Sequence, residues 1–437
     1  MKKSLISILC IIAITTFSLE VSAARIKINN ANREPMPIAI TEFLGQGDMK
    51  NIGKNMSDVI QNNLDSSGLF KSINRKSFVG QIKNITLPPR FADWRVINAQ
   101  ILLIGSLKKT SGGKFITEFR LWDVYSGREY VSKKYPAPVR SWRRVAHKIS
   151  DDIYTRLTGE GGYFDSSIVY VAQDGNWKKP RKRLAIMDQD GANHTFLTDG
   201  RDMVLSPRFD PTSQRIIYMS YRNNKPAVYL YDLPTGRISK LGNFKGMSYA
   251  PRFSNDGKKA VLSVSNRGVS NIYVMDIASK RTKRITKSNS IDTSPSFSAD
   301  DSKIVFNSDR SGRQHIYVMD ADGDNIHRIS NGKGSYATPV WSPRGDLIAF
   351  TKMYRGKFYI GVMRPNGKGE RLITESYLDE GPTWSPNGRV ILFNRQARGT
   401  KTASGVKKLY SIDLTGYNEK MVKTPTQAID PAWSPLK

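Results

Sequence analysis

A short phrase, Pro-x-[Phe/Trp]-[Ser/Asp], recurs six times in this chain of 437 residues. The copies lie 44, 44, 44, 43 and 49 residues apart and begin at Pro207, Pro251, Pro295, Pro339, Pro382 and Pro431. Most copies are followed by a turn sequence and two short apolar runs, such as residues 304–306 and 316–320. A repeat of this length that holds about four short strands is typical of a β-propeller blade. The repeat therefore predicts a β-propeller.

The two ends of the repeat are out of phase with each other. The first apolar core, at residues 168–171, has no phrase before it, and the last phrase, at Pro431, has no core after it. We expect the C-terminal strand to complete the first blade, because this closure removes the unpaired edges that an open array would leave. The prediction is a propeller of six blades over residues 163–437.

One aromatic residue per blade stands at the third position of the phrase. The six are Phe209, Phe253, Phe297, Trp341, Trp384 and Trp433. Apolar positions that recur with the repeat usually mark the core, so we expect these rings to pack between neighbouring sheets. The alternative is a ring of side chains that stacks on a ligand in the central channel.

The first 23 residues have the features of a secretory signal. Two lysines precede an apolar run over residues 4–19, which is short for a membrane span, and a Val-Ser-Ala sequence ends at Ala23. Cleavage there removes Cys10, the chain's only cysteine. No second apolar run approaches membrane-spanning length. We expect a soluble, exported protein that begins at Ala24 and needs no disulfide bond.

The chain carries a formal net charge of +30. Such a charge raises the alternative of a polyanion-binding protein. The basic residues are dispersed, however, and an exported protein meets little nucleic acid. The one dense run, residues 178–183, is predicted to be a solvated hairpin loop. We therefore expect no nucleic-acid partner.

Residues 24–162 do not repeat and alternate between strand and helix patterns. Residues 36–40 and the apolar run 99–107 are predicted strands, and the second is expected to be covered on both faces. Residues 52–64 and 142–157 have helical spacing of apolar residues. The prediction is a small α/β domain, joined to the propeller by a Gly-rich linker that ends at residue 162.

Catalytic and metal-binding motifs are missing from the linear sequence. The four histidines have no zinc-site spacing, and no Gly-x-Ser-x-Gly motif is present. Residues 47–55 fail as a phosphate loop, and residues 320–331 fail as a calcium loop because Asn325 and Asn331 replace the required Gly and Glu. We predict no metal and no cofactor. Acidic residues that six blades bring together at the channel remain an alternative, and would suit a lyase or glycosidase.

Several stretches outside the blade motif are shared with a known family. They are residues 37–40, 52–53, 65–70, 157–159, 168–171, 250–254, 272–276, 378–382 and 431–435. With this N-terminal domain and signal, the chain resembles the TolB family, the periplasmic component of the Tol-Pal system of Gram-negative bacteria. The resemblance implies a monomeric, non-enzymatic periplasmic adaptor that maintains outer-membrane integrity and constricts the outer membrane during cell division.

The resemblance also implies two binding partners. The peptidoglycan-associated lipoprotein Pal is expected at one mouth of the propeller channel, and the family's contact positions fall here on Met247, Ala250 and Thr293. Met247 departs from the family, which commonly has a histidine there. TolA, which is anchored in the inner membrane, is expected at the start of the mature chain.

The expected TolA-binding segment consists of Arg25, Ile26, Lys27, Ile28 and Asn29. Its two isoleucines alternate with polar residues, which suits a strand that adds to the edge of a partner's sheet. The same pattern suits an ordinary edge strand of the α/β domain. The resemblance favours the first of these two interpretations.

Overall fold

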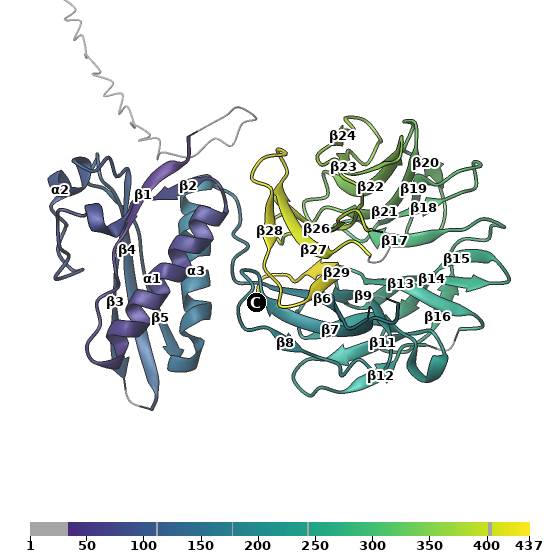
Figure 1. Cartoon of the computed structure of the whole chain (residues 1–437), viewed down its shortest axis with the longest axis horizontal. Coiled ribbons are helices and arrows are strands. Elements are labelled where there is room, and N and C mark those ends of the chain that lie inside the picture. The colour runs from purple at the N-terminus through teal and green to yellow at the C-terminus, as the bar shows by residue number, and fades with distance from the viewer. Residues whose placement is uncertain (1–33, 111, 177, 243, 401–403) are drawn as a thin grey trace, which may run out of the picture.

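The computed structural model describes residues 34–110, 112–176, 178–242, 244–400 and 404–437. The predicted signal and the segment Arg25 to Asn29 lie outside these ranges. Figure 1 shows a small α/β unit beside a β-propeller, with the C-terminus close to the place where the two meet. The predicted fold class, a small N-terminal α/β domain followed by a six-bladed propeller, is therefore confirmed.

The α/β unit is built on one five-stranded sheet with the strand order β2-β1-β3-β4-β5. Its strands are β1 (Met36–Ile40), β2 (Phe70–Ser72), β3 (Ile101–Thr110), β4 (Lys114–Asp123) and β5 (Glu129–Pro138). Its helices are α1 (Asp48–Ser66), α2 (Phe91–Arg95), α3 (Trp142–Thr158) and the 3-10 turns η1 (Arg75–Ser77) and η2 (Val139–Ser141). Strand β1 runs parallel to both of its neighbours, and the other pairs are antiparallel.

Strand β3 is buried on both faces, as its apolar run predicts. One face packs on α1 and α3, and Leu103 belongs to that core together with Ile60 and Ile153. The other face packs on the segment that holds α2, where Leu102 contacts the cluster around Trp94. Two long amphipathic helices and one connecting segment therefore enclose a sheet that is central to the unit.

Six four-stranded sheets form the propeller in the described residues, each with one innermost strand. The first blade consists of β29 (Gln427–Trp433), β6 (Ser167–Asp174), β7 (Arg181–Asp188) and β8 (Thr195–Phe196). The second blade consists of β9 (Val204–Phe209), β10 (Arg215–Ser220), β11 (Ala227–Asp232) and β12 (Ile238–Lys240). The 3-10 turn η3 (Arg222–Asn224) lies between β10 and β11. The third is β13 (Met247–Phe253), β14 (Lys259–Asn266), β15 (Val269–Asp276) and β16 (Thr282–Arg284), and the fourth is β17 (Thr293–Phe297), β18 (Lys303–Ser308), β19 (His315–Asp320) and β20 (His327–Arg328). The fifth is β21 (Ser335–Trp341), β22 (Ile348–Tyr354), β23 (Lys357–Met363) and β24 (Arg371–Leu372), and the sixth is β25 (Asp379–Trp384), β26 (Val390–Gln396), β27 (Lys407–Asp413) and β28 (Lys420–Val422).

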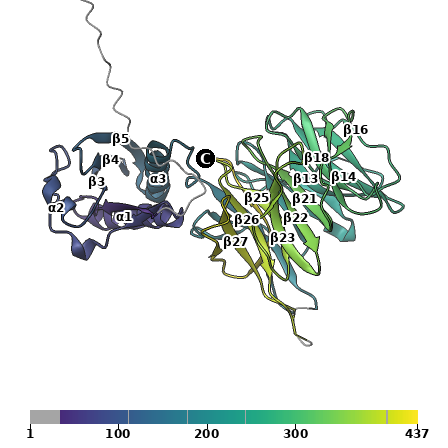
Figure 2. The ribbon, with the colours of Figure 1, turned by 90° about the horizontal axis from the view of Figure 1, so that it is seen from above.

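The C-terminal strand closes the ring. Strand β29 pairs antiparallel with β6, and Trp433 lies opposite Ile168. Beyond the strand, the Ser167 backbone N–H donates to Ser434 Oγ at 2.8 Å and the Ser434 backbone N–H donates to the Ser167 carbonyl at 2.8 Å. The predicted closure is confirmed. Figure 1 shows β29 next to β6, and Figure 2 shows the strands β25, β26 and β27 of the last blade on the side of the propeller nearer to the α/β unit.

The aromatic residues of the phrase pack between blades. Trp384 is 6% exposed, and its indole N–H donates to the Val340 carbonyl of the preceding blade at 3.0 Å. Phe297 and Trp341 belong to clusters that contain residues of two blades. Inter-blade packing, the expected role of these rings, is confirmed.

Each innermost strand also carries a β-bulge directly before the proline of its phrase. The register shifts at this point in every blade. The residue before the proline has a φ between 46° and 65° in all six copies, which are Ser206, Ala250, Ser294, Thr338, Gly381 and Asp430. A left-handed φ costs a residue with a side chain about 1–2 kcal/mol. Because all blades share the bulge, the fold itself imposes this conformation beside the channel.

The basic run at residues 178–183 corrects one expectation. It is not wholly a loop, because β7 begins at Arg181. Arg181 and Arg183 both contact the carboxylate of Asp174 on the paired strand β6. Cross-strand charge pairing therefore extends the hairpin into the basic run. Of the helices in the described ranges, none has both the length and the apolar character that membrane crossing would need.

Candidate functional site

The two mouths of the channel differ in which ends of the innermost strands they present. The innermost strands β9, β13, β17, β21, β25 and β29 occupy equivalent places in their sheets. Equivalent strands of a propeller run in the same direction, so their first residues gather at one mouth and their aromatic last residues at the other. We call these the strand-start face and the strand-end face.

Met247, Ala250 and Thr293 belong to the strand-start half of adjacent blades. Met247 is the first residue of β13 and Thr293 the first residue of β17, and these two strands are in contact. Ala250 is the bulge residue of β13, with a φ of 47°. All three residues are partly exposed. The structure thus places the three predicted Pal-contacting positions on neighbouring strands near one mouth.

Local packing fixes the positions of Met247 and Thr293. Gly246 precedes Met247 with a φ of 140°, and a Cβ atom there would lie 2.3 Å from the Ser265 carbonyl oxygen, so the turn requires glycine. Asp292 precedes Thr293 and is fully buried, and Arg310 Nη2 donates to both of its carboxylate oxygens at 2.9 Å. The turn at Gly246 and the ion pair between Asp292 and Arg310 therefore position these two residues.

Opposite, at the strand-end face, the six aromatic residues of the phrase surround a cavity of about 570 Å³. The indole N–H groups that border it already donate to protein acceptors. Trp341 donates to the Gly345 carbonyl at 3.1 Å, and Trp433 donates to Ser166 Oγ at 2.8 Å. The rings supply apolar walls to this cavity and no free donor.

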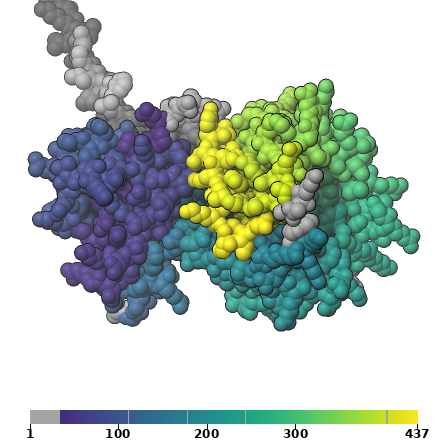
Figure 3. Space-filling model, viewed as in Figure 1, coloured from purple at the N-terminus to yellow at the C-terminus, as the bar shows by residue number. Residues whose placement is uncertain are grey.

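The strand-end face also carries the contacts with the α/β unit. Arg344 pairs with Glu160 at 3.0 Å, and Asn387 Nδ2 donates to the Gly161 carbonyl at 2.8 Å. Asn418 Nδ2 donates to the Ser66 carbonyl, at the end of α1, at 2.9 Å. In Figure 3 the last blade is seen directly against the α/β unit. Turns of the fifth and sixth blades thus hold the two units together.

A cavity of about 350 Å³ lies between the two units. Arg143 and Tyr163 line it from one side, and Asp413 and Lys420 line it from the other. The Lys420 ammonium group donates to the carbonyl of Ser66. Burial lowers the pKa of Lys420 to about 8, although Asp413 opposes the shift.

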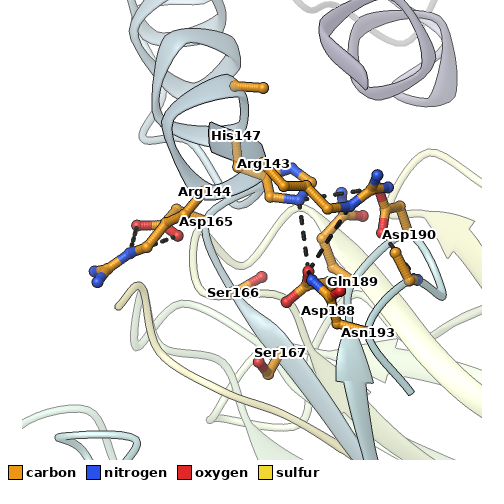
Figure 4. Close-up of polar contacts among 12 residues, drawn as sticks. Arg143, Arg144, His147, Asp165, Ser166, Ser167, Asp188, Gln189, Asp190 and Asn193 are labelled. Atoms are coloured by element: carbon orange, nitrogen blue, oxygen red, sulfur yellow. Dashed lines mark hydrogen bonds and ion pairs between the residues drawn. The ribbon is translucent and has the colours of Figure 1, made fainter. Parts of the chain in front are cut away.

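His147 on α3 stands at the centre of the contact with the first blade (Figure 4). Its Nδ1 lies 2.9 Å from Nδ2 of Asn63, an amide donor, so the Nε2 atom carries the proton of the neutral ring. Nε2 lies 4.0 Å from Asp188 Oδ2 and 3.9 Å from Asp190 Oδ2. Burial lowers the pKa of His147, and the two carboxylates oppose that shift. Gln189 extends the contact, because its Nε2 donates to Asn63 Oδ1 at 2.9 Å.

The ligand atoms of His147, Asp188 and Asp190 lie within 4.8 Å of one another, which is close enough for a metal ion. Their carboxylates already have cationic and amide partners, however. The Arg143 guanidinium donates to Asp190, and Lys437 Nζ lies 3.0 Å from Asp188 Oδ1. The group is therefore built as a charge-balanced contact between the units. Sequence reasoning did not find it, because its members come from a helix and a hairpin 41 residues apart and have no shared motif.

The enzyme alternative requires acidic residues at the channel, and Glu380 and Asp430 lie on the innermost strands of neighbouring blades. Burial, and then the charge of Asp430, raise the pKa of Glu380, while Lys407 opposes the shift. Asp430 Oδ2 also accepts the backbone N–H of Ser206 at 3.3 Å. Asp430 is therefore engaged in holding two innermost strands together, as a bulge residue of the first blade.

Comparison with known proteins gives matches along nearly the whole chain. A family model described as the TolB amino-terminal domain matches residues 24–130, and one described as the TolB beta propeller domain matches residues 154–437. The Tol-Pal system protein TolB of Paramagnetospirillum magneticum is 59% identical over 414 residues, which cover 94% of this chain and 93% of that protein.

Solved structures agree with these matches. The crystal structure of TolB from Acinetobacter baumannii superposes with a TM-score of 0.80 at 28% identity, covering 92% of this chain and 97% of that one. The hydrazine synthase of Kuenenia stuttgartiensis superposes with a TM-score of 0.51 at 14% identity, covering 64% of this chain and 47% of that one. The second likeness is one of fold alone.

Proposed function

The chain belongs to the TolB family, and we propose that it is a non-enzymatic periplasmic adaptor of the Tol-Pal system. In this role it binds Pal and TolA, maintains outer-membrane integrity and drives constriction of the outer membrane during division. The observation that carries the proposal is the 59% identity with a Tol-Pal system protein over nearly the full length of both chains. The domains that serve this role are residues 24–162 and 163–437, after a signal peptide at residues 1–23.

Pal binds, in this proposal, at the strand-start face through Met247, Ala250 and Thr293. Support comes from the distribution of contacts within the chain. In the described residues, the hydrogen bonds and ion pairs that join residues up to 162 to the propeller all reach turns on the strand-end side or residues next to them. The strand-start face therefore remains accessible when the two units are in contact.

A direct test uses purified mature protein and the soluble domain of Pal in isothermal titration calorimetry. The proposal expects saturable binding with one site per chain. An enzyme of the lyase or glycosidase class would instead turn over a small substrate at the channel and show no heat of binding with Pal. If the protein did not bind Pal and did turn over such a substrate, the enzyme interpretation would replace the adaptor interpretation.

TolA binds through Arg25, Ile26, Lys27, Ile28 and Asn29, and this binding is coupled to that of Pal. Coupling is reciprocal, so each partner changes the affinity of the other by the same factor. Titration of a C-terminal domain of TolA, with and without saturating Pal, measures that factor. Identical affinities in both titrations contradict the coupling, and unchanged TolA binding after deletion of residues 24–29 contradicts the site.

A further inference from the structure

The second residue of each Pro-x-aromatic phrase lies on an innermost strand beside the channel. Val340 and Thr383 hold this position in the fifth and sixth blades, and both line the cavity at the strand-end face. In the fourth blade the Oγ atom of Ser296 accepts the backbone N–H of Trp341, which lies on the innermost strand of the next blade, at 3.3 Å. The position therefore faces the space between successive innermost strands.

Arginines occupy this position in two adjacent blades, Arg208 in the second and Arg252 in the third. The other four blades place uncharged residues there, namely Ser296, Val340, Thr383 and Ala432. The strands that carry the arginines, β9 and β13, are in contact. One side of the channel thus carries two arginines at equivalent positions of neighbouring strands, and the equivalent position of the other four blades holds no acid.

These two arginines lack the kind of acidic partner that Arg215 and Arg310 have. Arg215 and Arg310 each pair with a fully buried aspartate on or beside an innermost strand. Among the described residues, the one hydrogen bond of the Arg208 side chain is from Nη1 to the adjacent Pro207 carbonyl, at 2.6 Å. Across the part of the chain that the structure describes, Arg252 makes neither a hydrogen bond nor an ion pair through its side chain.

Both arginines are partly exposed, as expected of side chains that line a channel. Burial, followed by repulsion from Arg208, lowers the pKa of Arg252 well below its usual value. Burial also lowers the pKa of Arg208, and Asp430 opposes that shift without forming an ion pair. A desolvated pair of like charges is unfavourable unless an opposite charge joins it.

We propose that Arg208 and Arg252 form a binding site for a small oxyanion in the central channel. The planar guanidinium group presents several N–H donors in a geometry that fits carboxylate and phosphate oxygens. An anion between the two side chains would offset their repulsion and satisfy donors that have no protein acceptor. This site lies outside the proposed Pal and TolA contacts and does not depend on them.

The test is calorimetric titration of the mature protein, alone, with sodium phosphate in one arm and sodium acetate in the other, at constant ionic strength. The variant is Arg208→Gln with Arg252→Gln. Its matched control is Arg237→Gln with Arg267→Gln, which removes the same charge from exposed positions. The expected result is saturable binding at one site, weakened roughly tenfold or more in the channel variant and unchanged in the control.

The two arms separate a phosphate-type ligand from a carboxylate, and saturable binding in either arm supports the site. No saturable binding in both arms, or equal binding by the channel variant, overturns it. If the channel variant does not fold, a crystal of the unchanged protein soaked in sodium selenate decides the question. An anomalous selenium peak beside Arg208 and Arg252 is expected, and a map without a peak there contradicts the proposal.

Discussion

The strand-start and strand-end faces of the propeller come from the same six repeats and differ in what packs on them. The strand-end face contacts the α/β unit through the turns around Arg344, Asn387, Gln189 and Asn418. The strand-start face presents Met247, Ala250 and Thr293, which are partly exposed. The repeat therefore sets the positions of the strands in the same way at both mouths. The α/β unit covers part of one mouth and so determines which mouth a partner can reach.

The two faces exist only while the ring of six blades is closed. We therefore expect the largest loss of stability from a change that opens the ring. Deletion of residues 429–437 removes most of β29 and leaves β6 with an unpaired edge. Loss of Trp433 from its packed site alone should cost about 3–5 kcal/mol. Thermal unfolding followed by circular dichroism should show a large drop in Tm or loss of the folded state. A truncated protein that melts like the full-length chain would contradict the closure.

The next largest effect concerns the contact between the units at the strand-end face. Asn63 is 1% exposed and bonds with His147, Ser150 and Gln189. Asn63→Ala should lower the free energy of unfolding by about 2–3 kcal/mol, because it leaves buried polar partners unsatisfied. Urea unfolding measures this loss, with the exposed neighbour Asn62→Ala as control. Equal stability of the two variants would mean that the contact does not hold the units together.

The same contact should respond to pH through His147. Burial lowers the pKa of this histidine in the folded protein, so the unfolded chain binds the proton more readily. Its contribution to stability is therefore present above the unfolded pKa, about 6.5, and is lost as the pH falls below it. His147→Gln removes this titration. Unfolding free energies measured between pH 7.5 and pH 5 should fall less steeply in the variant, and parallel curves would exclude His147 as the group responsible.

The smallest effect tests the bulge that shapes the channel wall. Gly381 has a φ of 65° at the bulge of the sixth blade, where the other blades carry residues with side chains. Gly381→Ala should cost about 1 kcal/mol, since the left-handed conformation disfavours a Cβ atom. Ala250→Gly, the reverse change in the third blade, should be neutral or stabilising. Chemical denaturation distinguishes the two signs, and a stabilising Gly381→Ala would show that the bulge is not strained.

The propeller could be predicted in detail because its information is repeated along the chain. The Pro-x-aromatic phrase gave the number of blades, the packing of the rings and the closure by the segment around Trp433. The bulge before each proline was not foreseen. It depends on a backbone conformation that Ser206, Ala250 and Asp430 adopt equally, and these residues share no side-chain property that a pattern could reveal.

The strand-end contacts could not be predicted, for a different physical reason. His147, Asp188 and Asn63 acquire their roles only when the α/β unit docks on the propeller, and no local pattern encodes that docking. The arginines at positions 208 and 252 were visible inside the phrase, but their lack of partners became apparent only once the acids of the other blades were placed. Structure that depends on neighbouring residues can be predicted from the sequence. Contacts between the two units can be identified only once the folded structure is known.

The central claim is that Pal binds at the strand-start face, and paired substitutions on the two faces test it most directly. Thr293→Arg and Ala250→Glu place bulky charges at the strand-start face, and Ala299→Glu places one at the opposite mouth, in the same blade as Thr293. Calorimetric titration of each folded variant with Pal should show binding abolished by the first two and unchanged by Ala299→Glu. Unchanged binding in both Thr293→Arg and Ala250→Glu would contradict the account.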